Sequence, residues 1–283
     1  MAAQAIAQNL ALINWTVLTG LAIGCLAVVA VADLGTEATR GFLAFTAASA
    51  VAFGLLAWLS DGSLPSSVVD SPVVVDPSWD LPRRWALAAF IALSAAEVIV
   101  VWRRRRSRAL VVAALVAAVA ILVTSALTWG GPRPTAIVLF VQQTLLAAAT
   151  GGVFGAMVLG HWYLVTPKLP EGPLVLVSRL LLGLLIGLTV LSVVFAATGI
   201  GVPGSDPGGA EPFAILVGPW ALFAWLRLLV GLAFPLVVSW MALQTAKSRS
   251  MESATGLLYI NVGSVAAGTI LAAGVFFGAG LFI

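Results

Sequence analysis

Eight long apolar stretches, separated by short polar segments, constrain what this chain can fold into. They lie near residues 13–32, 41–60, 84–102, 109–129, 135–161, 174–198, 213–243 and 254–282. A helix that crosses the hydrocarbon core of a bilayer needs about 20 apolar residues, and each stretch is long enough. Of the 283 residues, 61% are hydrophobic and only 9% are charged, too little charge to cover a water-soluble domain of this size. The sequence therefore predicts an all-α integral membrane protein with eight transmembrane helices.

The basic residues predict the orientation of these helices. The loops after the first, third, fifth and seventh helices share one side, which carries Arg40, Arg103, Arg104, Arg105, Arg106, Arg108, Lys168, Arg179, Lys247 and Arg249. The other side carries Arg83, Arg84 and Arg133. Because lysine and arginine accumulate in cytoplasmic loops, we expect both termini to lie outside the cytoplasm, in a prokaryotic-type inner (plasma) membrane. Tryptophans near most helix ends agree, since indole rings favour the membrane interface.

The stretch from Gln142 to Pro170 is expected to form the central packing helix. Its small residues occur at four-residue spacing on one face, with a second pair beside them: Ala148, Gly152, Ala156 and Gly160, then Gly151 and Gly155. Helices in lipid associate without a hydrophobic force, so small side chains promote packing by letting two backbones approach. Gly274 and Gly278 predict a similar packing face on the last helix.

An internal duplication would divide the chain into two four-helix membrane halves, residues 1–132 and 133–283. Trp102 and Trp240 close the third and seventh predicted helices, and Arg40 and Arg179 stand near the start of the second and sixth. The two halves would then be parallel repeats, an arrangement in which transporters place their ligand sites between the repeats. Chance similarity between apolar segments is the alternative.

Polar side chains within the predicted spans are candidate functional groups, because such groups are costly to bury in lipid. On the inner side they are Glu97, His161, Tyr163 and Asn261. These residues could form a protonatable cluster in which His161, the only histidine, exchanges protons near a carboxylate. Alternatively, His161 and Tyr163 lie among lipid headgroups, and Glu97 is neutral or hydrogen-bonded to a neighbouring helix.

On the outer side the candidates are Arg227, Gln142 and Gln143. Arg227 could snorkel towards the interface, pair with an outer carboxylate such as Asp61 or Asp206, or bind an anionic or carbonyl group of a ligand. A helical rise of 1.5 Å per residue places Arg227 and Glu97 roughly 12 Å apart along the membrane normal, so they are not expected to form an ion pair.

Missing motifs disfavour several classes of function. A haem held by two histidines is disfavoured because the chain has one, and the single cysteine, Cys25, provides no disulfide and no cysteine-based metal site. No nucleotide-binding loop, HExxH motif or nucleophile elbow occurs, so the chain is not expected to be an enzyme alone, and no catalytic or metal-binding residue is assigned. The net charge of +3 comes from loop arginines and does not indicate nucleic acid as a partner.

Eight spans, outward termini and the absence of paired haem histidines give the chain a resemblance to the membrane-anchor subunits of dimethyl-sulfoxide-reductase-type oxidoreductases. Its segment GTILAAGVFFGAG (268–280) is similar to the end of those anchors, although apolar residues replace the acidic residue and the arginine that are usual there. The resemblance implies two four-helix bundles that exchange electrons between a quinone and soluble redox partners, as in a respiratory or photosynthetic complex.

The function implied is an integral membrane subunit of an energy-transducing redox complex, which anchors other subunits and contacts quinone or lipid. His161 or Glu97 would exchange protons, and Arg227 or Gln143 would hydrogen-bond a quinone carbonyl. The expected ligands are a quinone and bound lipids, and the expected partners are membrane lipids and other subunits. Two alternatives stay open: a multi-pass transporter with Glu97 as the coupling carboxylate, and a purely structural or assembly subunit.

Overall fold

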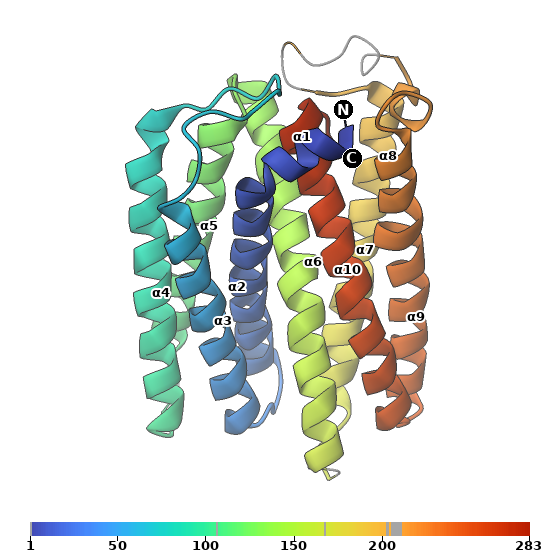
Figure 1. The fold of residues 1–283 in the computed structure, drawn as a ribbon. Helices are drawn as coiled ribbons and strands as arrows, with labels where there is room; N and C mark the ends of the chain where they lie inside the picture. Colours follow the sequence, from blue (N-terminus) through green and yellow to red (C-terminus); the bar gives the residue numbers. More distant parts are fainter. Residues whose placement is uncertain (1, 106, 167, 202–203, 205–210) are drawn as a thin grey trace.

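The computed structural model describes residues 2–105, 107–166, 168–201, 204 and 211–283, which form a bundle of long helices (Figure 1). Eight helical segments are long and apolar enough to cross a membrane, so the predicted all-α, multi-pass fold is confirmed. They are α2 (Leu10–Gly35), α3 (Arg40–Asp61), α4 (Asp80–Trp102), α5 (Arg108–Trp129), α6 (Arg133–Val165), α7 (Gly172–Thr198), a composite seventh span (Ala221–Lys247) and α10 (Met251–Ala279).

The two ends of the bundle differ in their connections. We call the end that carries the turns after α3, α5 and α7 the outer end, and both chain ends lie there (Figure 1). The opposite end, with the turns after α2, α4, α6 and the seventh span, is the inner end. The charge bias predicts that the inner end is cytoplasmic. Arg106 and Asp206 of the sequence analysis lie outside the described residues.

Two spans differ from the continuous helices that the apolar stretches predict. A short helix, α1 (Ala2–Gln8), precedes α2, and the chain turns between them at Asn9. The seventh span starts at Ala221, because the preceding residues form a 3₁₀ turn, η3 (Ala214–Leu216). This span consists of α8 (Ala221–Leu228), a π-helical turn η4 (Leu229–Ala233) and α9 (Phe234–Lys247). Pro235 follows the π turn, and its missing N–H interrupts the regular α-helical hydrogen-bond pattern.

Helix α6 is the centre of the bundle, with α2, α10, α7 and α5 packed around it (Figure 1). The backbones of α6 and α2 lie close together at Gly151, where an added Cβ would lie 2.5 Å from the Cα of Gly24. Gly155, one turn away, packs against the side chain of Val28. A buried hydrogen bond of 2.7 Å between the hydroxyls of Thr150 and Thr269 joins α6 to α10. The central role predicted for this helix is therefore seen in its contacts.

The predicted four-residue face of α6 is only partly a packing face. A Cβ at Gly152 would meet no atom within 4 Å, and Gly152 and Ala148 line a small groove between α2, α6 and α7. Ala156 is fully buried, and Gly160 packs against Thr255 of α10. The close contact with α2 thus uses the neighbouring pair, Gly151 and Gly155, because that side of α6 faces the partner helix. On α10, Gly274 packs against Ile6 and Gly278 against the ring of Trp220.

The helices pack as two neighbouring groups of four. Helices α2 to α5 contact one another in a ring, and α6, α7, the seventh span and α10 form a second ring. Between the rings, α2 contacts α6 and α10, while α6 contacts α2 and α5. The first helix of each half therefore touches the first and last helices of the other, as a two-fold axis along the membrane normal would arrange them. The division near residue 132 and the internal duplication both stay predictions.

Candidate functional site

The candidate residues separate into two classes according to whether their polar atoms already have partners. A buried hydrogen-bonding group without a partner costs about 1–3 kcal/mol, more if it is charged. Such a group indicates a functional role, in which a ligand or a proton would satisfy its hydrogen bonds. The hydrogen bonds of each candidate therefore distinguish residues that serve the fold from residues that remain available to a ligand or a proton.

The two outer glutamines serve the fold. The side-chain nitrogen of Gln142 donates to the carbonyl of Ile283 at 3.0 Å, which ties α6 to the C-terminal segment. The side-chain oxygen of Gln143 accepts a bond of 2.6 Å from the hydroxyl of Ser125 on α5. Both side chains are buried, and these bonds fix helix positions at the outer end.

Three of the four inner candidates also have partners. The Tyr163 hydroxyl donates to the carbonyl of Pro170, which closes the turn after α6. The Asn261 side-chain nitrogen donates to the Ser239 hydroxyl at 2.6 Å and thereby joins α10 to α9. His161 is exposed, and its Nδ1 lies 3.3 Å from the hydroxyl of Tyr259. These side chains hold the inner end of the second half together.

Glu97 is separated from those three residues. It lies on α4, which packs mainly against α3 and α5, whereas the other three lie on α6 and α10 (Figure 1). No hydrogen bond in the described part of the chain joins Glu97 to any of them. The sequence predicts a similar depth for these residues, but the lateral order of the helices separates Glu97 from the other three.

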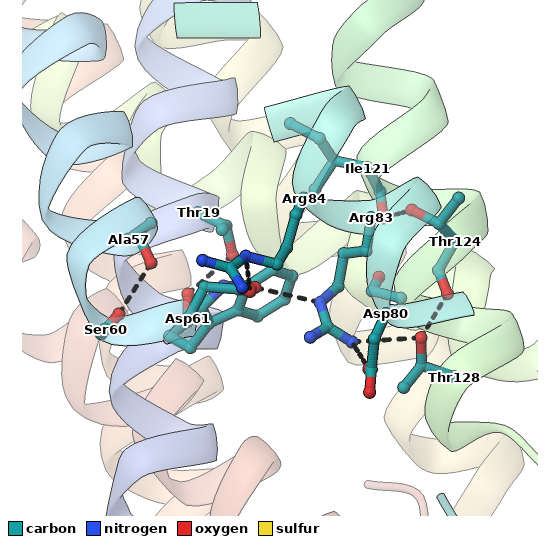
Figure 2. A network of polar contacts seen from close by, with 12 residues as sticks. Thr19, Ala57, Ser60, Asp61, Asp80, Arg83, Arg84, Ile121, Thr124 and Thr128 are labelled. Carbon is teal, nitrogen blue, oxygen red and sulfur yellow. Dashed lines mark hydrogen bonds and ion pairs between the residues drawn. The ribbon is translucent and has the colours of Figure 1, made fainter. Parts of the chain in front are cut away.

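The sequence did not predict that a polar network forms at the outer end. The arginines of this network served there only to predict the topology. Figure 2 shows Arg83 of α4 between two acidic side chains: its Nε lies 3.1 Å from Asp61 and its Nη1 lies 2.8 Å from Asp80. Nη1 also donates to the hydroxyl of Thr128 at 3.2 Å. Arg84 pairs with the other oxygen of Asp61 at 3.3 Å. Asp61 is thus the partner of these arginines, and not of Arg227.

Aromatic rings complete the surroundings of Arg83. Its guanidinium carbon lies 4.8 Å from the ring centroid of Trp129 and 5.5 Å from that of Trp15, distances at which a cation is attracted to an indole. Both tryptophans are 1% exposed. They stand at helix ends, as predicted, yet they pack on a buried cation and not at the lipid interface. In the sequence, the acidic residues at the two ends of the loop before Arg83 could have indicated this network.

Arg227 is the first candidate with unused hydrogen-bond donors. It lies on α8, 1% exposed, and its Nη1 donates to the carbonyl of Gly231 at 3.1 Å. In a regular helix the residue four positions after Gly231 would donate to that carbonyl, but this residue is Pro235, which has no N–H. Within the described part of the chain, Nε and Nη2 of Arg227 have no hydrogen-bond partner.

Two glycines create the space that Arg227 occupies. A Cβ at Gly268 of α10 would lie 2.6 Å from Nη1 of Arg227, and a Cβ at Gly231 would lie 2.5 Å from the Cα of Gly268. The absence of side chains at both positions lets η4 and α10 touch and leaves room for the guanidinium beside them. The structure therefore accommodates a buried cation in the second half without supplying an acidic partner among the described contacts.

Glu97 is the second candidate with unused polar atoms. It is fully buried on α4, and both carboxylate oxygens lack a hydrogen-bond partner among the described residues. Asp33 of α2 lies near enough to act on it electrostatically. The hydroxyls of Ser94, one turn away, and of Thr46 on α3 are likewise buried without a partner in this part of the structure.

The register of α3 against α4 places Thr46 at the level of Glu97. A Cβ at Gly54 would touch Ile91 at 3.0 Å, which fixes one point of this antiparallel contact. Thr46 and Glu97 both lie towards the inner end from that point, by roughly 9–12 Å at 1.5 Å per residue. Of these three residues the sequence predicts a role for Glu97 alone, because Ser94 and Thr46 are ordinary residues of membrane helices.

No group of three His, Cys, Asp or Glu side chains in the described residues is arranged to hold a metal ion. Comparisons of the chain with protein-family models, with curated proteins and with solved structures found no match.

Proposed function

We propose that this protein is an integral membrane subunit of an energy-transducing redox complex, and that Arg227 binds a carbonyl oxygen of a quinone. The observation that supports the proposal is the pair of N–H donors, at Nε and Nη2, that are buried without a partner among the described residues. An oxygen acceptor that reaches them would form charge-assisted hydrogen bonds, which are about twice as strong as neutral ones.

The position of Arg227 favours a ligand that travels in the membrane. It follows Trp220, at the start of α8, by seven residues, which corresponds to roughly 10 Å of helix. A quinone is soluble in the hydrocarbon region and carries carbonyl oxygens on an apolar ring, so it matches both the depth and the donors. The redox assignment and the partner subunits rest on the topological resemblance to oxidoreductase anchors.

A purification from native membranes tests this proposal. The complete chain, isolated in mild detergent, should retain redox subunits and quinone, identified by mass spectrometry and solvent extraction. In Arg227→Gln the ratio of quinone to protein should fall at least about tenfold, since each hydrogen bond to a charged group contributes about 1.5–3 kcal/mol. Arg133→Gln, which changes an exposed outer arginine, is the matched control and should retain the quinone.

Arg227→Lys separates charge from geometry. Lysine keeps the positive charge but lacks the planar, forked donors of arginine, so it should restore only part of the quinone content. A wild-type protein that is recovered alone and without quinone would contradict the proposal. Equal quinone content in Arg227→Gln and the wild type would contradict the role given to Arg227.

A transporter is the second candidate, and Glu97 favours it. A buried carboxyl group whose oxygens have no hydrogen-bond partner among the described residues, with Asp33 close enough to act on it electrostatically, is suited to bind and release a proton. In proteoliposomes, a proton gradient should then drive substrate uptake by the wild type but not by Glu97→Gln, which cannot ionise. Uptake that is equal in both, or absent from both, would contradict a coupling role for Glu97.

A further inference from the structure

A groove at the inner end of the first half lies between the start of α3 and the end of α4. Its volume is about 540 Å³, and its walls include Arg40, Phe45, Ala48, Val98, Trp102 and Arg104. We call it the inner groove. It lies apart from Arg227, and it is distinct from Glu97, whose buried side chain is not among its walls.

The inner groove has a basic rim and an apolar floor. Arg40 is the first residue of α3, and Arg104 follows the end of α4, so the two cations meet at the level where both helices leave the membrane. Neither arginine forms an ion pair within the described residues. Arg103 and Arg105 add further positive charge to the same turn. Deeper in the membrane, the walls are the side chains of Phe45, Ala48 and Val98.

The rim is held in place by the fold. A Cβ at Gly41 would lie 2.4 Å from the ring of Trp162, so the start of α3 packs directly on α6. Arg104 has a left-handed backbone with φ of 59°, and its N–H donates to the carbonyl of Val101 at 3.0 Å. Trp102 is 81% exposed beside the groove, as expected for an indole ring at the membrane interface.

We propose that the inner groove binds one anionic phospholipid from the leaflet at the inner end. The phosphate lies between Arg40 and Arg104, and an acyl chain covers the apolar wall formed by α3 and α4. Arginine favours phosphate because its fork of donors can contact two phosphate oxygens together. A free phosphate ion would leave the apolar wall uncovered, whereas a phospholipid satisfies the charged rim and the wall with one molecule.

Defined lipid mixtures test the assignment. The complete protein is reconstituted in nanodiscs that contain equal amounts of phosphatidylglycerol and phosphatidylcholine, then released into mild detergent and examined by native mass spectrometry. The wild type should retain phosphatidylglycerol preferentially. In Arg40→Gln/Arg104→Gln the retained phosphatidylglycerol should fall by about fivefold or more for each arginine, the attraction typical of one basic residue at an anionic surface.

Two further variants separate the groove from general surface charge. Arg108→Gln changes an exposed arginine of the same end that does not line the groove, and it should alter retention by less than about twofold, because a solvent-exposed charge that does not contact the phosphate is screened by salt. Ala48→Phe fills the groove from an exposed position, so the core stays intact while lipid retention is lost with both arginines present. Gel filtration and circular dichroism confirm the fold of each variant.

Three results would overturn the proposal. They are equal retention of the two lipids by the wild type, equal losses in Arg108→Gln and the double variant, and full retention in Ala48→Phe. The first result would favour a protein partner as the occupant of the groove. The second would show that lipid retention depends on the whole basic surface.

Discussion

Adjacent glycines on α6 provide a matched test of the close contact between α6 and α2. A methyl group at Gly151 would lie 2.5 Å from the Cα of Gly24 and 2.6 Å from both the backbone nitrogen of Cys25 and the carbonyl oxygen of Leu21. Nonbonded carbon atoms prefer about 3.5–4.0 Å, so the two helices must separate by roughly 1 Å. All three atoms belong to the backbone, so no change of rotamer can relieve the clash.

The expected destabilisation of Gly151→Ala follows from two opposing terms. Overpacking costs about 1–3 kcal/mol, and the greater helix preference of alanine over glycine offsets about 1 kcal/mol of that cost. Separation of the helices also weakens the contact of Gly155 with Val28, one turn away. The two terms leave a net loss of about 0–2 kcal/mol in the free energy of unfolding, and we expect the upper half of that range because the clash is with backbone atoms.

Gly152→Ala is the control, because it makes the same chemical change at the next residue. Its new methyl group would meet no atom within 4 Å. Only the helix preference then acts, so this variant should be unchanged or more stable by up to about 1 kcal/mol. The measurement is reversible unfolding in mixed micelles with increasing dodecyl sulfate, followed by tryptophan fluorescence. Equal midpoints for the two variants would refute the packing that we describe.

Three further predictions concern polar contacts. Asp61→Asn should lower the free energy of unfolding by about 3 kcal/mol. This is the low end for a broken buried ion pair, because Asp80 and Thr128 still contact Arg83. A loss below about 1 kcal/mol in the same micelles would contradict this prediction. A double-mutant cycle of Thr150→Val and Thr269→Val should give a coupling of about 1 kcal/mol, and additive effects would show that their hydrogen bond contributes nothing. Hydrogen bonds from the Ser78 hydroxyl and amide lower the pKa of Asp76 from its ordinary 3.8. The stabilising effect of Asp76 is therefore complete above pH 3.8 and is lost as the pH falls through the lowered pKa. Ser78→Ala should raise the pKa of Asp76 in a carboxyl NMR titration, and an unchanged pKa would contradict the hydrogen bond from the hydroxyl.

The number and type of the helices were predictable because each crossing segment must satisfy its own backbone hydrogen bonds. Length and hydropathy therefore suffice, and the eight apolar stretches match eight helical spans. The side of α6 that meets α2 was not predictable in the same way. Gly151 and Gly152 both fit a small-residue pattern, and only the position of the partner helix decides which of them packs.

The candidate sites were predictable only in part, since burial and partners depend on helices that are distant in the sequence. Depth along a helix predicts different layers for Glu97 and Arg227, but it could not show that α4, which carries Glu97, packs mainly on α3 and α5 and not on the helix of Asn261. Arg83 was counted as a loop arginine because its partner Asp61 lies across a loop, on the preceding helix. Pro235 stands within an apolar stretch, and its effect on the Gly231 carbonyl becomes visible only with Arg227 in place.

The buried charge of Arg227 also has an electrical consequence. At roughly 10 Å below the outer end, in a hydrocarbon core of about 30 Å, it lies about a third of the way across the membrane potential. One elementary charge that crosses the full potential gains or loses about 2.3 kcal/mol per 100 mV. The affinity of a monovalent anion that reaches Arg227 from the outer end therefore changes by about fourfold per 100 mV. A neutral carbonyl compound experiences no such effect. The voltage dependence of occupancy would therefore report the charge of whatever Arg227 holds.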